Sequence, residues 1–330
     1  MNRVACGLGA LVLAALPHFT RGTQTEFLTE IFVYGIFALS LNILIGRLGL
    51  ISFGHGLFLG AGAYLAAFQL VHLTDNLFAL LAVALVVGAL VASVVGLLVL
   101  RLGGVGFVMI TIAMCQLFYV LVLSTQAVSG GINGLSGLPR PTLWPGAGPD
   151  WISLDNEVTF YYVALACLVL FVLLLRRFDR SRMGMVFHGI RQNPVRMRAL
   201  GYPVRTFQLI GFVMAGAAAA VAGALGAGLQ GLVDPTVFFW TTSGEVILMV
   251  ILGGSTALLG PVVGAAIFLT LFHQLSGITD HWRLVLGVAF VLVVLYAPRG
   301  VVPMIGEAWR LRRGTRAAPS IAPGGTEAAR

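Results

Sequence analysis

Long apolar runs constrain this chain more than any other feature. Several of them reach or approach the roughly 20 residues that a helix needs to cross the hydrocarbon core of a bilayer. Of the 330 residues, 58% are hydrophobic, and a soluble domain of this composition could not cover its surface with polar groups. The sequence therefore predicts an all-α, polytopic membrane protein. The runs lie at Val4–Leu16, 27–46, 50–72, 77–100, 104–125, 158–175, 207–230, 243–275 and 281–298.

The positions of the arginines predict the orientation of these runs. Arg3, Arg47 and Arg101 lie beside or between apolar runs, and residues 176–205, the basic segment, hold eight arginines and one acid, Asp179. Cytoplasmic loops of membrane proteins carry an excess of basic residues. With Arg3 inside, successive crossings bring all these basic positions to the cytoplasm. We therefore expect both termini to be cytoplasmic.

Two regions outside the apolar runs have their own character. Residues 126–157 fall on the external side in this orientation, and their Gly, Pro, Asp and Asn content predicts an ordered loop with turns. Residues 299–330 carry six arginines and are expected to form a cytoplasmic basic tail that is partly disordered. We expect residues 1–298 to form one transmembrane domain, with Val4–Leu16 as a first membrane helix rather than a cleaved signal peptide.

The run 243–275 is interrupted by GGSTALLGP at 253–261. Run 207–230 leaves the cytoplasm and run 281–298 returns to it, so the interrupted run makes either two crossings or none. We expect two short helices or a re-entrant hairpin, which gives about ten membrane segments in all. A similar glycine-led break at 45–64 forms a weak internal echo, and paired broken helices indicate a transport pathway.

Several classes of activity are excluded by missing residue types. All 20 basic residues are arginine, so the chain has no lysine for a Walker A nucleotide site or for a Schiff base. Cys6, Cys115 and Cys167 lie in apolar stretches and form no C-x-x-C pair. No cluster of Cys, His and carboxylates has the spacing of metal ligands. We therefore expect no catalytic residue, no cofactor and no metal, and we attribute the net charge of +8 to cytoplasmic arginines rather than to nucleic-acid binding.

Four polar residues within the apolar runs are candidates for lining a translocation pathway. Asn42, Ser52 and His55 surround the first break, and they either satisfy one another where the helix breaks or line a polar pathway. Glu245 follows Thr241, Thr242 and Ser243. It is expected in the first turn of a helix that these hydroxyls cap, or it is a buried functional carboxylate.

The basic segment interleaves arginines with apolar residues and with glycines and prolines. A short helix lying across the membrane surface would present both kinds of side chain to a partner. Binding of anionic lipid head groups is the other interpretation of such a segment.

Four ordered stretches carry a resemblance to a known family. They are GRLGLISFGHGLFLGAGAYLAA (46–67), SGGINGLSGLP (129–139), GIRQNPVRMRALGYPVRTFQ (189–208) and SGEVILMVILGGSTALLGPVVGAAIF (243–268), with AGAAAAVAGAL (215–225) before the last. In this order they resemble the permease subunits of ABC importers of the branched-chain amino acid type, in particular the longer of the two paralogous permeases. The resemblance covers the chain from about residue 27 to 298.

The resemblance implies that the basic segment contains the coupling helix that docks in a cleft of an ATPase subunit. The general permease pattern has Glu-Ala-Ala six residues before the last glycine, where this chain has Val195, Arg196 and Met197. The coupling positions carried over are Gly189, Ile190, Arg191, Gln192, Asn193, Pro194, Arg196, Arg198 and Gly201.

The resemblance also implies partners and a location. The partners are a second paralogous permease, two ABC ATPase subunits, a periplasmic substrate-binding protein and membrane lipid, and the location is the bacterial inner membrane. The implied substrates are leucine, isoleucine and valine, with urea, short amides or another small solute as the alternative. A stand-alone proton-coupled transporter using His55 or Glu245 is a second hypothesis, disfavoured by the scarcity of intramembrane carboxylates.

Overall fold

The structure is a computed structural model that describes residues 16–18, 22–143, 154, 156–278, 281, 284–285, 287–288, 290–291, 295 and 300–304. The predicted first helix at Val4–Leu16 lies outside these residues except for Leu16. The same holds for most of the run 281–298 and of the tail 299–330. Part of the predicted external loop, at 144–153, also lies outside them.

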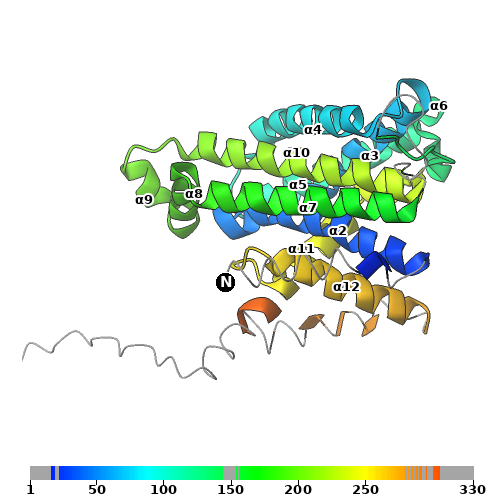
Figure 1. The fold of residues 1–330 in the computed structure, drawn as a ribbon. Coiled ribbons are helices and arrows are strands. Elements are labelled where there is room, and N and C mark those ends of the chain that lie inside the picture. The colour runs from blue at the N-terminus through cyan, green and yellow to red at the C-terminus, as the bar shows by residue number, and fades with distance from the viewer. Residues whose placement is uncertain are drawn as a thin grey trace, which may run out of the picture.

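The described part of the chain is a bundle of helices. α2, α7 and α10 run side by side, α4 lies on one side of them and α11 and α12 on the other, while α8 and α9 lie at one end (Figure 1). The helices are α2 (Thr23–Asn42), α3 (His55–His72), α4 (Leu77–Val99), α5 (Val105–Ser124), α6 (Gln126–Ser129), α7 (Glu157–Asp179), α8 (Arg182–Gln192), α9 (Pro194–Ala199), α10 (Val204–Gln230), α11 (Trp240–Gly253) and α12 (Gly260–Ser276). The short elements are η1 (Leu16–His18), the π-helix η2 (Ile43–Leu48), η3 (Gly131–Asn133), η5 (Pro235–Phe238), β1 (Leu135–Ser136) and β2 (Leu232–Val233).

Five described helices are long and apolar enough to cross a membrane, which identifies a multi-pass membrane protein. They are Thr23–Leu48, Leu77–Val99, Val105–Ser124, Glu157–Asp179 and Val204–Gln230. In α4, α5 and α7 only 28%, 22% and 33% of the most apolar window is buried, against 78% in Thr23–Leu48. These three helices therefore form the apolar perimeter of this chain, and α2 with its π-helical end forms its centre.

Both ends of the basic segment are helical. Arg176 and Arg177 occupy the last turn of α7, where cationic side chains complement the helix dipole. Arg205 lies in the first turn of α10. The basic segment is therefore continuous with two long helices. In the described part of 126–157, β1 pairs antiparallel with β2 beyond the end of α10.

Glycines permit the close crossing of α3 and α10 at the centre of the bundle. A Cβ on Gly62 would lie 2.0 Å from the carbonyl oxygen of Ala220, and a Cβ on Gly223 would lie 2.0 Å from that of Leu59. Backbone atoms cannot rotate away from such a contact as a side chain can. Small residues allow helices in membranes to approach closely, and here they set the distance between the two helices.

The substitution Gly223→Ala is expected to destabilise the protein strongly, by about 3 kcal/mol, because the added methyl group overlaps the backbone of α3. Gly226→Ala is the matched control on the same helix, since its Cβ would lie 3.7 Å from the nearest atom, in Val33. Thermal unfolding in mild detergent measures both. Equal unfolding temperatures for the two variants would contradict the close crossing.

Both predicted breaks are present. Residues 254–259 separate the short helices α11 and α12, which pack against each other, with Gly254 at φ 98°. A Cβ on Gly264 would lie 1.9 Å from the carbonyl oxygen of Met249, so these two helices are almost in backbone contact. At the other break, α2 continues into η2, which ends at Gly49 with φ 73°, before α3 begins at His55.

Candidate functional site

The two breaks meet in the interior of the bundle. In the orientation of the Asn42 amide that satisfies both of its polar atoms, the nitrogen donates to the carbonyl oxygen of Ser255 at 3.2 Å and the oxygen accepts from Nη1 of Arg47 at 3.0 Å. A Cβ on Gly46 would lie 2.6 Å from that same Ser255 oxygen. Irregular backbone at membrane depth is tolerated where protein or a water-filled cavity surrounds it. The junction of the breaks is thus a polar region enclosed within an apolar bundle.

His55 begins α3 and is completely buried. Its Nε2 lies 2.8 Å from Oγ of Ser40 in α2, and its ring stacks on Phe37 with centroids 5.4 Å apart. Nδ1 of His55 has no hydrogen-bond partner among the described residues. The imidazole therefore joins the start of α3 to the middle of α2 and retains one unused nitrogen.

A double-mutant cycle tests the contact between His55 and Ser40. The Nε2–Oγ hydrogen bond is buried, so we expect His55→Leu and Ser40→Ala to be non-additive by about 1 kcal/mol in free energy of unfolding. Chemical denaturation in detergent micelles measures the four proteins of the cycle. Strict additivity would show that the two side chains do not interact.

Hydroxyl groups fasten the loop 49–54 and the first turn of α3 to neighbouring helices. The backbone N–H of Gly56 donates to Oγ of Ser243 in α11 at 2.8 Å. The N–H of Phe53 donates to Oγ1 of Thr111 in α5 at 3.3 Å. Ser52 is fully buried, and its Oγ accepts from the N–H of Gly54 at 3.2 Å. The hydrogen bonds of Ser40, Thr111 and Ser243 could not be predicted from the sequence, because single small hydroxyls in apolar helices carry no signal of their contacts.

Glu245 lies elsewhere in α11 than predicted. The helix begins at Trp240 directly after η5, with Phe239 as its N-cap and no side-chain cap, so Glu245 is not in the first turn. Thr242 instead donates to the carbonyl oxygen of Thr236. The predicted cap is wrong because α11 begins at Trp240, so the hydroxyl residues lie inside the helix rather than before it. Glu245 is half-buried and lies close enough to Tyr34 of α2 to interact electrostatically with it.

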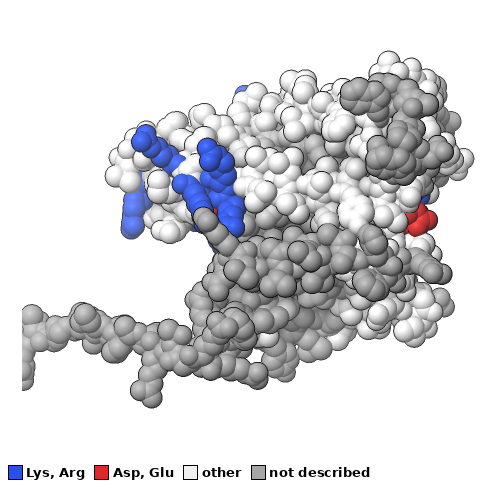
Figure 2. Space-filling model, in the orientation of Figure 1, with Lys and Arg blue, Asp and Glu red and all other residues white. Residues whose placement is uncertain are grey.

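The coupling positions form a helix, a sharp corner and a second, short helix. Oδ1 of Asn193 caps α9 by accepting from the N–H of Arg196 at 2.9 Å, and Pro194 occupies the first position of that helix. α8 buries Phe187 and Ile190 against the bundle, whereas α9 buries no residue. Figure 2 shows that arginines gather over this end of the molecule. α9 is thus an exposed basic projection held on a buried base.

Two contacts connect the basic segment to the first break. Arg47 in η2 is buried, with 5% of its side chain exposed, and forms a bidentate pair with Asp179, with Nε–Oδ1 at 2.8 Å and Nη2–Oδ2 at 2.9 Å. Nη1 of Arg191 donates to the carbonyl oxygen of Gly46. The side chain of Arg191 also lies against Gly49. The end of α7 and the end of α8 therefore both hold the π-helix where α2 breaks.

The structure separates the predicted coupling residues into two groups. Arg191 contacts the break through Gly46, and Ile190 is buried in the bundle. Arg196 and Arg198 are exposed on α9 and form no ion pair within the described part of the chain. Among the pathway candidates, Asn42, Ser52 and His55 gather around the first break, and Glu245 lies in α11 near Tyr34 of α2. The coupling and pathway roles of these residues stay predictions.

The opposite end of the bundle holds a charged cavity of about 740 Å³. Arg140 pairs with Glu26 at 3.1 Å, and Nε2 of His273 lies 3.1 Å from Oε2 of Glu30. These residues come from α2, α12 and the segment after β1. The molecule therefore carries a basic projection at one end and a cavity with charges of both signs at the other.

Comparisons with a family model and with individual proteins point to the same family. The family model for the branched-chain amino acid transport system / permease component matches residues 24–295. The chain is 29% identical over 323 residues to the high-affinity branched-chain amino acid transport system permease protein LivM of Escherichia coli, covering 92% of this chain and 76% of that protein. It is 28% identical over 325 residues to LivM of Salmonella typhimurium, covering 93% and 76%. No solved structure matches the chain.

Proposed function

Because the chain belongs to the family of branched-chain amino acid transport system permease components, we propose that it forms half of the translocation pathway of an ATP-driven importer. The proposed substrates are leucine, isoleucine and valine, as the names of the LivM relatives suggest. The sequence has no lysine for a Walker A site, so we assign ATP hydrolysis to partner subunits.

The observation that carries the proposal is the double connection between the basic segment and the first break. An importer must turn motion of an ATPase into motion of membrane helices. Here Asp179 at the end of α7 and Arg191 in the last turn of α8 both hold η2, through Arg47 and Gly46 respectively. A π-helix is a local irregularity that often marks functional sites. Displacement of α8 and α9 by an ATPase would therefore act directly on the break in α2.

The proposed assembly contains a second paralogous permease, two ATPase subunits and a periplasmic binding protein in the bacterial inner membrane. α9, as part of the coupling element Gly189–Gly201, docks the ATPase. The external face, with 126–157 and the charged cavity, receives the binding protein. In this arrangement the chain has about ten membrane segments and both termini in the cytoplasm. The concentration of arginines at the α8–α9 end supports this orientation (Figure 2).

The proposed pathway residues are Asn42, Ser52, His55 and Glu245. The first three lie where irregular backbone brings polar groups into an apolar bundle, which supports a role in passing a polar solute. Glu245 lies in α11, the helix that leads into the second break.

Affinity purification of the tagged chain from its native membrane in mild detergent, followed by mass spectrometry, tests the assembly. We expect recovery of a second permease and of P-loop ATPases. A chain that purifies alone and moves solutes by itself would overturn the proposal in favour of a secondary transporter that uses His55 or Glu245. Competition by urea or short amides, without competition by leucine, would replace the proposed substrates within the same mechanism.

A further inference from the structure

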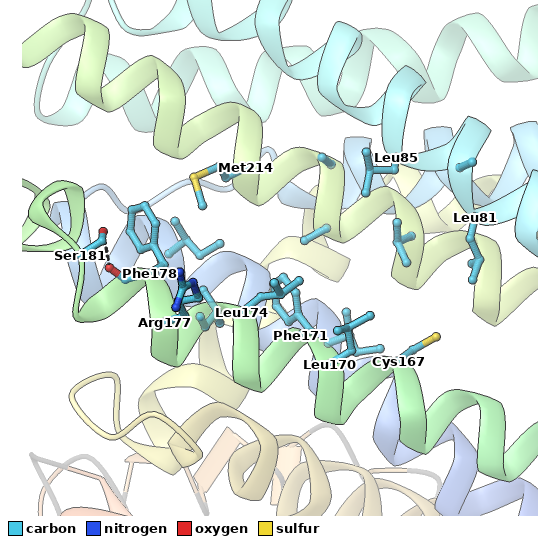
Figure 3. Close-up of a pocket in the computed structure, with 17 residues that line it drawn as sticks. Leu81, Leu85, Cys167, Leu170, Phe171, Leu174, Arg177, Phe178, Ser181 and Met214 are labelled. Atoms are coloured by element: carbon cyan, nitrogen blue, oxygen red, sulfur yellow. Dashed lines mark hydrogen bonds between the residues drawn. The ribbon is translucent and has the colours of Figure 1, made fainter.

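An apolar groove of about 700 Å³ runs along α7, between this helix and α4 and α10 (Figure 3). Leu170 and Leu174 form the α7 wall, and both are more than half exposed. Leu85 lines it from α4, and Ala217 and Ala218 line it from α10. The small alanines make room between larger side chains, so the groove is a hollow in the apolar perimeter of the chain.

The groove has the length of one leaflet of a bilayer. It extends along α7 from Cys167 to Phe178 and Ser181, which Figure 3 shows at opposite ends. Cys167 lies about 15 Å along the helix axis from Arg177, the basic residue that lines the groove, at 1.5 Å per residue. The hydrocarbon core is about 30 Å thick, so this distance is close to half of it. An acyl chain of the leaflet on the arginine side matches this extent.

One end of the groove is basic. Arg177 lines the groove and also an adjoining cavity of about 440 Å³, which Arg176, Arg180 and Ser181 complete. The neighbouring acid, Asp179, is already engaged by Arg47. Among the residues that the structure describes, no carboxylate pairs with these three arginines. Three guanidinium groups with no carboxylate partner in the described part of the chain, at the mouth of an apolar groove, favour an anion that carries an apolar chain.

The start of α8 adds to the positive character of this end. Ser181 is the N-cap of α8, and its Oγ accepts from the N–H of Gly184 at 3.2 Å. The N-terminus of a helix carries a partial positive charge. The helix end and the three arginines therefore favour the same sign of ligand at the same place.

We propose that this groove binds one anionic phospholipid of the cytoplasmic leaflet. An acyl chain lies along Leu170 and Leu174, and the phosphate lies among Arg176, Arg177 and Arg180. The proposal goes beyond transport and shares with the proposed function only the orientation that places the basic segment in the cytoplasm.

Native mass spectrometry of the purified complex in detergent, with added phosphatidylglycerol or phosphatidylcholine, tests the site. We expect one phosphatidylglycerol to be retained in preference to phosphatidylcholine. Arg177→Gln/Arg180→Gln should weaken this retention about 30-fold, because each arginine near an anionic head group contributes about one factor of five. The matched control is Arg101→Gln/Arg205→Gln, which removes two exposed arginines that line a different cavity and should leave retention unchanged.

A second pair of variants tests the acyl part of the groove. Ala82 is exposed and lines the groove, so Ala82→Trp should fill it and release the lipid. Val86→Trp, an exposed position of α4 outside the lining, should retain the lipid. Displacement by inorganic phosphate alone would overturn the proposal in favour of a free anion site.

Three other results would also overturn the proposal. They are equal retention of the two lipids, equal loss in the control arginine variant, and lipid bound to the isolated chain but absent from the complete complex. The last would show that a partner subunit fills the groove. A failure of the lipid site can be told apart from a failure of the proposed function, because copurification of the ATPases is measured in the same samples. Arg177→Gln/Arg180→Gln should lose the lipid and keep the ATPases.

Discussion

Charge reversal of α9, in the variant Arg196→Glu/Arg198→Glu, is expected to abolish ATP-driven uptake while the chain still inserts and folds. Both arginines are exposed, and α9 buries no residue, so the change leaves the packing of the bundle intact. Removing a charge that is paired across an interface costs about 2 kcal/mol or more, and reversing it adds repulsion. Two such changes should weaken docking of the ATPase by about 1,000-fold.

The measurement is copurification of the ATPase subunits together with substrate uptake in cells that express the complete system. Arg101→Glu/Arg205→Glu is the matched control, because it reverses two exposed arginines outside α9. This control should keep both activities. Normal uptake by the Arg196→Glu/Arg198→Glu variant would remove α9 from the docking surface.

Asp179→Asn is expected to have the second large effect. It leaves the guanidinium of Arg47 buried, at 5% exposure, without its bidentate partner. Breaking a buried ion pair by removing one charge costs about 3 to 5 kcal/mol. Part of this loss is local, because the pair fastens the end of α7 to η2. We therefore expect a lower unfolding temperature and, in protein that still folds, ATP hydrolysis that no longer drives uptake.

Two comparisons separate this effect from a general loss of charge. Asp75→Asn removes an acid that forms no ion pair in the described part of the chain and should change neither property. Arg47→Leu/Asp179→Leu removes both charges and should recover much of the stability, because no buried charge is left unpaired. Uptake should stay low in this double variant. Uncoupled hydrolysis in the Asp75 variant, or tight coupling in the double variant, would contradict the role of the pair.

The sequence predicted the helices well because apolar composition and length determine them almost alone. The runs at 77–100, 104–125 and 207–230 correspond closely to α4, α5 and α10. The break at 253–261 was predictable because its glycines and proline disfavour a continuous helix, and α11 and α12 end and begin there. The boundaries of α7 were harder to predict, since arginines at the end of a membrane helix extend it by placing their charged groups at the interface.

The contacts that hold the candidate site together could not be predicted in the same way. Arg47 and Asp179 are 132 residues apart, and Gly56 and Ser243 are 187 residues apart. Their pairing depends on how the bundle packs, which no local pattern encodes. The sequence marked Asn42, Ser52 and His55 as unusual for their depth, but no local pattern indicates that Asn42 faces Ser255 or that His55 reaches Ser40. The prediction of Glu245 in a first turn failed for a local reason, because α11 begins at Trp240 with Phe239 as its N-cap, before the hydroxyl residues that were expected to cap it.

Uptake of labelled leucine into proteoliposomes tests the central claim most directly. The vesicles contain this chain with its copurified permease and ATPases, with ATP inside and the substrate-binding protein outside. The proposed function predicts uptake that requires ATP and the binding protein and that falls to background with Arg196→Glu/Arg198→Glu. Uptake by this chain alone, driven by a proton gradient and unaffected by ATP, would contradict the assignment of the chain as a permease coupled through its basic segment.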